Sequence, residues 1–355
     1  MYSVYQHWDP LKVCIVGKSY SPEFYSFIKN DRVRTVMERI ARETEEDYQK
    51  LIELLEKFNV KVLRPTVTDN YLDYLDTDKG KIVPPPMTPR DYSLMLGNDF
   101  YWRIHDAWKI DRPGEQVKAK FWKDIIQHIS EQNNTIIDNP PLPSIMAGLD
   151  GANTVRVGKD LYVGTLPNHT SEMIESLKSD LMQVFNQKNY RVDVIDSQGH
   201  NDGVLCVVKP GLIVSLKEIK NYEKTFPNWE VIYLPYQSWD KVGEFLQLKK
   251  KNNGKWWVPG EELNDEFTSF VEEWMSHWVG YVEETVFDVN MLVIDKHNVV
   301  CNNYNKDVFD AFERHGVTPH VINFRHRYFW DGGLHCITSD LHREGVMEDY
   351  FPERG

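Results

Sequence analysis

Short runs of β-forming residues alternate with amphipathic helices along the chain, and this alternation limits the fold to a mixed α/β architecture. The opening of the chain shows the pattern. Lys12–Gly17 (KVCIVG) predicts a buried strand, Thr35–Asn59 a long helix with one apolar face, and Val60–Leu63 a second strand. The chain is therefore predicted to begin with a β-α-β unit.

Similar units return along the rest of the sequence. Helices are predicted over Gln116–Glu131, Ser171–Phe185 (with Ser171 as N-cap) and Asp307–His315. The predicted strands are Tyr92–Leu96, Thr154–Val157, Asp160–Val163, Val192–Ile195, Val204–Val208, Leu212–Val214, Val231–Leu234, Met291–Ile294, Val299–Val300 and Val321–Phe324. The units recur roughly every 60–70 residues, which is too irregular for a solenoid. Because no linker or composition break divides the chain, residues 1–355 are predicted to form a single domain with internal repetition.

The composition excludes several classes of protein. Hydrophobic residues make up 41% of the chain and charged residues 27%, which is enough to bury a core without disulfides. The formal net charge is −13, from 41 basic and 54 acidic side chains. This charge argues against a nucleic-acid partner, whose binding face is normally basic, and against an anionic membrane surface. No stretch approaches the roughly 18 consecutive apolar residues of a membrane span.

The N-terminal segment and the cysteines indicate a reduced, cytoplasmic protein. Met1–Pro10 has no basic segment followed by an apolar run, so no signal peptide is predicted. The cysteines lie far apart and form no C-x-x-C pair, which argues against a zinc ribbon or a thioredoxin-like motif; they are Cys14, Cys206, Cys301 and Cys336. Neither a metal nor another cofactor is predicted. A homodimer is an open alternative to a monomer.

The most unusual stretch is Asp331–Asp340 (DGGLHCITSD). Glycines directly before a His-Cys pair let the backbone approach a ligand closely and present the thiol of Cys336 at a turn. The alternative is a buried core cysteine beside a structural His335, because free cysteines usually behave as small hydrophobic residues.

A second candidate is Ser197–Gly203 (SQGHNDG), which lies between two predicted strands. His200 and Asp202 place a proton carrier and an anion in one Gly-flanked turn; the alternative is a solvated turn. Asp91 and Asp150 stand at two more strand entrances, where acids are often turn formers or caps. The chain has no GxGxxG, Walker A, HExxH or GxSxG motif, which disfavours nucleotide-binding, zinc-peptidase and serine-hydrolase functions.

Together these segments resemble the glycine amidinotransferases (arginine:glycine amidinotransferases) of the pentein superfamily of guanidino-group-modifying enzymes. The resemblance runs almost end to end, and the match around the cysteine is the most specific. The matching segments are Asp9–Gly17 with DPLxxVIVG, Pro89–Asp91 with PRD, Leu149–Asp160 with FDAADFxRxGRD, His200–Asp202 with HID, Asn290–Asp295 with NVLxLD, and Gly332–Asp340 with GGFHCWTCD.

The resemblance implies a fold and a reaction. The fold would be an α/β propeller of five ββαβ modules with pseudo-fivefold symmetry around a central active-site channel. The enzyme would be a transferase that moves the amidino group of L-arginine to an acceptor amine without a cofactor. Glycine is the default acceptor, and its products are guanidinoacetate and ornithine.

The resemblance also implies a role for each matching residue. Cys336 would attack the guanidinium carbon and hold the amidino group covalently. His200 would protonate the leaving amine and deprotonate the incoming one, and Asp150 would orient His200. Asp91 and Asp202 would bind the substrate guanidinium by charge-assisted hydrogen bonds.

The chain departs from the glycine-specific pattern around the expected substrate pocket. Where the family holds the donor carboxylate with an arginine, this sequence offers Lys217 and Lys220. Where the family has a serine pair, it has Glu283 and Glu284. A carboxylate in the pocket would repel glycine and favour a second ammonium group, unless both glutamates face solvent, as most do.

Two other functions fit part of the same evidence. A hydrolase of the same superfamily, such as an arginine deiminase-like enzyme, would use water in place of the acceptor amine. A pentein-fold binding protein without catalysis is more remote, because it would have no reason to keep a cysteine, a histidine and three acids together.

Overall fold

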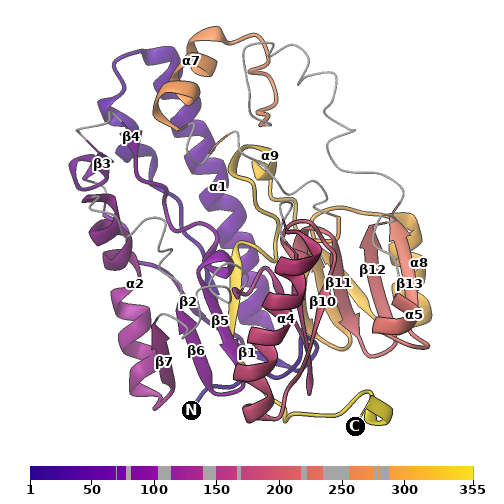
Figure 1. The fold of residues 1–355 in the computed structure, drawn as a ribbon. Coiled ribbons are helices and arrows are strands. Elements are labelled where there is room, and N and C mark those ends of the chain that lie inside the picture. Colours follow the sequence, from indigo (N-terminus) through magenta and orange to yellow (C-terminus); the bar gives the residue numbers. More distant parts are fainter. Residues whose placement is uncertain are drawn as a thin grey trace.

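The structure is a computed structural model of the chain. Most of its described part consists of five three-stranded sheets with the same strand arrangement (Figure 1). The structure describes residues 1–68, 70–76, 81–102, 113–138, 149–165, 169–216, 222–234, 256–275, 279 and 288–354. In each sheet the first strand pairs antiparallel with the second, and the second runs parallel to the third. A helix connects the second strand to the third, so each sheet is one ββαβ module.

The modules follow one another along the chain, and the last one closes the ring. Their elements are β5 (Ser93–Leu96), β6 (Asp99–Trp102), α2 (Pro113–Glu131) and β7 (Thr135–Asp138); β8 (Thr154–Val157), β9 (Asp160–Gly164), α4 (Ser171–Phe185) and β10 (Arg191–Ile195); β11 (Leu205–Lys209), β12 (Leu212–Leu216), α5 (Tyr222–Thr225) and β13 (Glu230–Leu234); β14 (Leu292–Asp295), β15 (Asn298–Cys301), α8 (Lys306–Arg314) and β16 (Thr318–Val321); and β17 (Thr338–Arg343), β1 (Leu11–Val16), α1 (Asp31–Lys57) and β2 (Lys61–Leu63). In the last module the two ends of the chain meet, because β17 pairs with β1. The predicted propeller of five ββαβ modules is confirmed.

Smaller elements complete the described part. They are the two-stranded sheet of β3 (Leu75–Asp76) and β4 (Lys81–Ile82), the helices α7 (Asp265–Trp274) and α9 (Arg327–Trp330), and 3₁₀ helices at Pro22–Phe27, Tyr71–Asp73, Pro89–Asp91, Asn186–Lys188, Asn201–Gly203 and Pro352–Arg354. Helix α7 packs on α1, while α1, α2, α4 and α8 each pack on the third strand of their own module. No helix in the described ranges is both long and apolar enough to cross a membrane.

Helix starts are set by capping side chains. The side chain of Asn30 accepts hydrogen bonds from the main-chain N–H of Arg32 and Val33, so α1 begins at Asp31, one turn earlier than predicted. The N-cap of α4 is Thr170, whose side chain accepts from Met173 N–H, and the prediction of Ser171 was wrong by one residue. Such shifts are expected because the cap depends on local backbone geometry.

One predicted strand was misplaced. The third strand of the module that contains β14 and β15 is Thr318–Val321 (β16) and not Val321–Phe324. This segment pairs with β15 on one side only, and Pro319 stands opposite Val299. Proline is tolerated on an edge strand but weakens the sequence signal for a strand. Other elements carry no prediction from the sequence; they are strands β3, β4, β6, β7 and β17 and helices α5, α7 and α9.

First strands of the modules meet at the centre of the described structure. Ser93 of β5 and Ser339 of β17 share a hydrogen bond of 2.9 Å between their hydroxyls. Arg156 of β8 bonds to Asp340 of β17 at 2.7 Å, and Arg343 of β17 donates to the main-chain oxygen of Val293 in β14 at 2.8 Å. The ends of these strands therefore come together near one axis.

Candidate active site

Every residue predicted for the site lies immediately before the first strand of a module. Because these strands meet at the centre, the residues before them converge as well. Asp91 precedes β5, Asp150 precedes β8, His200 and Asp202 precede β11, and Cys336 precedes β17.

Main-chain hydrogen bonds tie these entrances to one another. The N–H of Gly151 donates to the main-chain oxygens of Arg90 (3.0 Å) and Ser93 (3.1 Å). The N–H of Asp202 donates to the oxygen of Ala152 at 3.0 Å. The segments that carry Asp91, Asp150 and His200 are thus joined through their backbones, which fixes where their side chains start.

The thiol of Cys336 is buried, with 1% of the residue exposed. Its Sγ lies 3.5 Å from Oδ2 of Asp202 and 2.9 Å from Nδ2 of Asn290. The structure therefore brings the predicted nucleophile against one predicted substrate-binding carboxylate. It also adds Asn290, which directly precedes the fourth module and which sequence reasoning matched only as the start of a strand.

The glycine pair before Cys336 was expected to let the backbone approach a ligand. In the structure, the close approach is to Asn290. A Cβ on Gly333 would lie 2.6 Å from Asn290 Oδ1, so a larger residue would displace this amide. Asn290 Oδ1 also accepts the main-chain N–H groups of His335 (2.9 Å) and Cys336 (3.1 Å). Gly333 is therefore required for the packing of the loop.

Two histidines belong to this arrangement, and they differ in exposure. His200 is partly open, with 33% of its side chain exposed, and its Nδ1 lies 3.9 Å from Oδ1 of Asp91. His335 is more enclosed, with 12% of its side chain exposed, and its Nδ1 lies 2.7 Å from Oδ2 of Asp202. Desolvation by burial, with smaller effects of Arg90 and His7, holds the pKa of His335 well below its usual range. His335 is thus neutral and donates Nδ1–H to Asp202, while the accessible His200 is better placed to exchange protons.

Asp150 is buried at the start of the second of these entrances. Its Oδ1 accepts the main-chain N–H of Asn153 at 2.7 Å, which shapes the turn into β8. Its assignment as the carboxylate that orients His200 stays a prediction, as do the roles of Asp91, Asp202, His200 and Cys336.

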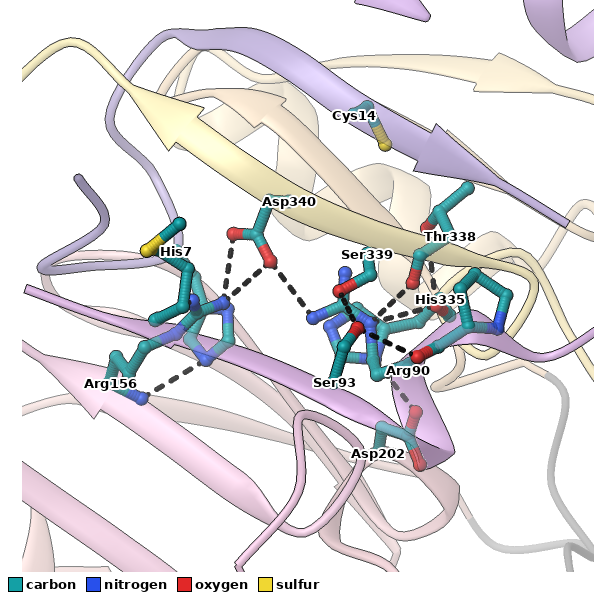
Figure 2. A network of polar contacts seen from close by, with 12 residues as sticks. His7, Cys14, Arg90, Ser93, Arg156, Asp202, His335, Thr338, Ser339 and Asp340 are labelled. Carbon is teal, nitrogen blue, oxygen red and sulfur yellow. Dashed lines mark hydrogen bonds and ion pairs between the residues drawn. The ribbon is translucent and has the colours of Figure 1, made fainter. Parts of the chain in front are cut away.

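A cluster of buried charges lies beside the site (Figure 2). The carboxylate of Asp340 bonds to Arg90 (3.0 Å), Arg156 (2.7 Å) and Arg343 (2.6 Å). Burial alone would raise the pKa of Asp340, but the three guanidinium groups hold it well below its usual range. We call these four residues the arginine hub. Sequence reasoning missed it, although Arg90, Arg156 and Asp340 all stand inside the motifs that carried the resemblance.

The hub also supports the loop that carries Cys336, the predicted nucleophile. Arg90 Nε donates to the main-chain oxygens of His335 (2.9 Å) and Thr338 (2.8 Å), which flank Cys336 in sequence. Next to the hub is a cavity of about 20 Å³, lined in part by His7, Thr154 and Asp202. This volume holds about one water molecule.

Some predicted features lie outside the described residues: Lys217, Lys220, Glu283 and Glu284. In the ranges that the structure does describe, no three His, Cys, Asp or Glu side chains gather to hold a metal ion.

Comparison with known sequences identifies relatives over nearly the whole chain. Glycine amidinotransferase, mitochondrial, of Xenopus tropicalis is 21% identical over 392 residues, covering 98% of this chain and 84% of the relative. Inosamine-phosphate amidinotransferase 1 of Streptomyces glaucescens is 24% identical over 388 residues and covers 98% of both chains. No family profile matches the chain.

Solved structures show the same fold. An amidinotransferase of the saxitoxin biosynthetic pathway from Microseira wollei superposes with a TM-score of 0.65 at 20% identity, covering 99% of both chains. Inosamine-phosphate amidinotransferase from Streptomyces griseus gives 0.66 at 18% identity, with the same coverage. A dimethylarginine dimethylaminohydrolase gives 0.51 at 11% identity over 93% of this chain and 99% of the other, a likeness in fold alone.

Proposed function

We propose that this chain, which is homologous to the amidinotransferases and has the pentein fold, moves the amidino group of L-arginine to an acceptor amine. The contact that supports this reaction most directly is the 3.5 Å between Cys336 Sγ and Asp202 Oδ2. A thiol is the nucleophile that the reaction needs, and a carboxylate beside it can hold the guanidinium that the thiol attacks.

The first half of the reaction frees ornithine. Asp91 and Asp202 bind the arginine guanidinium, and the Cys336 thiolate attacks its central carbon Cζ. His200 protonates Nε as the Cζ–Nε bond breaks, so ornithine leaves as an amine and the amidino group stays on sulfur. Because the site carries several acidic groups, a bound cation reduces their mutual repulsion.

The second half returns the thiol. The acceptor amine loses a proton to His200 and attacks Cζ, the Cζ–Sγ bond breaks, and a new guanidino compound leaves. Glycine is the default acceptor and would yield guanidinoacetate. Acceptors differ among the named relatives, which act on glycine or on inosamine phosphate. If Glu283 or Glu284 faces the pocket, a diamine will be a better acceptor than glycine.

Mass spectrometry and product analysis test the proposal together. Brief exposure to L-arginine should add one amidino group to the protein, and peptide mapping should place it on Cys336. Ornithine should accumulate only when an amine is added, with glycine, ethanolamine and a short diamine as the acceptors to compare.

Two other outcomes of these experiments would count against amidino transfer. Citrulline formed from arginine alone would favour a deiminase-like hydrolase. Absence of both an adduct and arginine consumption with every amine would contradict the proposed reaction. The cytoplasmic location, the single domain and a homodimer stay predictions.

A further inference from the structure

We propose that Asn290 is a further catalytic residue, which stabilises the anionic form of the Cys336 sulfur by donating a side-chain N–H to it. This inference deepens the proposed function and rests on it, because the sulfur is the reacting atom of that reaction. The geometry behind it is the 2.9 Å between Asn290 Nδ2 and Cys336 Sγ.

The orientation of the Asn290 amide follows from its neighbours. Its oxygen faces two main-chain N–H groups, those of His335 at 2.9 Å and Cys336 at 3.1 Å. A flipped amide would place its NH₂ against these two donors, which is unfavourable. The NH₂ group must therefore face the sulfur, and its other hydrogen is directed to the main-chain oxygen of Asp202 at 3.1 Å.

The amide is also held in place. Asn290 is fully buried, with 0% exposed, and its main-chain oxygen accepts a hydrogen bond of 2.8 Å from Asn302 Nδ2. Gly333 packs directly on the amide, because a Cβ there would come within 2.6 Å of Oδ1 and 2.8 Å of Asn290 Cβ. A donor held rigidly toward developing charge stabilises it without reorganisation.

The charged groups near the Cys336 sulfur bear on how much a negative sulfur depends on the Asn290 donor. The carboxylate of Asp202, 3.5 Å away, disfavours a negative sulfur. His335, the residue before Cys336, has 12% of its side chain exposed and is hydrogen-bonded to Asp202, and its pKa is held well below its usual range, chiefly by desolvation. Arg90 is directed to Asp340 and to main-chain oxygens. His200 has its Nδ1 3.9 Å from Oδ1 of Asp91.

The test is the rate at which iodoacetamide alkylates Cys336 as a function of pH, which needs no substrate. The other cysteines are a low background, because burial raises the pKa of Cys14 and Cys206 to about 12 and that of Cys301 further still. Cys336→Ala measures this background directly.

Two variants remove the contact in different ways. Asn290→Asp keeps the accepting oxygen but replaces the NH₂ donor with a carboxylate oxygen, which adds its own repulsion to the sulfur. Gly333→Ala adds no charge and leaves Asn290 in the chain while displacing its amide, so its shift reports loss of the donor alone. We expect alkylation of Cys336 near pH 7 to slow roughly tenfold or more in Asn290→Asp, with its pH midpoint moved upward. Gly333→Ala should shift in the same direction by a smaller factor.

Asn134→Ala is the matched control, since it removes a buried amide whose hydrogen bonds go to the main chain of Tyr2 and Asn98. It should alkylate within about twofold of wild type, because sulfur stabilisation is local. Unchanged profiles in Gly333→Ala and in Asn290→Asp, with both proteins folded by thermal melting, would overturn the inference. If Asn290→Asp does not fold, Gly333→Ala alone decides it.

Alkylation and turnover separate this inference from the proposed function. Wild-type protein with a low alkylation midpoint but no amidino transfer would contradict the proposed function and leave the role of Asn290 in sulfur stabilisation. Normal transfer with unshifted alkylation in the variants would contradict the role of Asn290 only.

Discussion

The arginine hub and the candidate active site are neighbouring clusters with opposite charge balance. The hub joins three arginines to one carboxylate, Asp340. The site gathers the carboxylates of Asp91, Asp150 and Asp202 with a thiol and a histidine. One cluster thus has an excess of cations and the other an excess of acids.

The difference lies in how the charges are used. In the hub, guanidinium groups bond to Asp340 and to main-chain oxygens, including Met95 at 2.7 Å and Val293 at 2.8 Å. These bonds cross between modules, so the hub serves the fold. For the acids of the site we propose a different use, in which they bind a substrate guanidinium that neutralises them. Substitutions in the two clusters should therefore separate stability from turnover.

The largest effect should come from the nucleophile. Cys336→Ala should abolish amidino transfer, because no other cysteine of the chain stands in polar, glycine-rich surroundings. Steady-state ornithine release measures this loss. Cys301→Ser is the control, since Cys301 is a core residue 3.5 Å from the Met291 sulfur and should affect stability more than chemistry. Full activity in Cys336→Ala would contradict the mechanism.

The next largest effect should come from the proton carrier. His200→Asn keeps a similar shape but cannot shuttle a proton, and kcat should fall by roughly 10²–10⁴-fold. A retained rate would point to His335, the other histidine beside the nucleophile. His335→Asn tests this directly: since His335 is neutral and bonded to Asp202, we expect it to change KM for arginine more than the pH profile of kcat.

In the hub, the expected loss is in stability. Asp340→Asn would leave three buried guanidinium groups without their carboxylate, and breaking such a buried cluster typically costs about 3–5 kcal/mol. Urea denaturation measures the change in unfolding free energy. Asp349→Asn, which removes a partly exposed partner of Arg191, is the control and should cost about 1 kcal/mol or less. Equal losses in the two variants would show that the hub has no special role.

The smallest effect should be a pH dependence at Asp9. Burial raises the pKa of Asp9 to about 6, and its Oδ2 has no hydrogen-bond partner among the described residues. An unfolded aspartate titrates near about 3.9, so folding favours the protonated form.

The contribution of Asp9 to the free energy of unfolding is therefore present at low pH. It is lost as pH rises from about 4 to about 6, and the loss is at most about 3 kcal/mol. Asp9→Asn should abolish this part of the dependence, measured as denaturation midpoints across that window. Glu53→Gln, at an exposed position of α1, should leave it unchanged. A profile in Asp9→Asn that parallels wild type would contradict the expected titration of Asp9.

Much of the fold could be predicted from the sequence, because its signals are local. Strands such as Leu212–Leu216 are continuous apolar runs, and helices such as α8 carry one apolar stripe below an Asn N-cap. The entrances to the first strands were recognisable as motifs. The edge strand β16, with Pro319 in its middle, has neither signal and was misplaced.

By itself, the sequence determined the α/β class, since this depends on patterns of residues close together in the chain, and its motifs indicated the ββαβ modules and the candidate reacting groups through their resemblance to a known family. Only the tertiary structure decided what surrounds those groups. Asn290 reaches Cys336 from 46 residues away, and Arg90 reaches Asp340 from 250. Such contacts arise when modules close into a ring, and no local periodicity or spacing records which polar side chain will then face which.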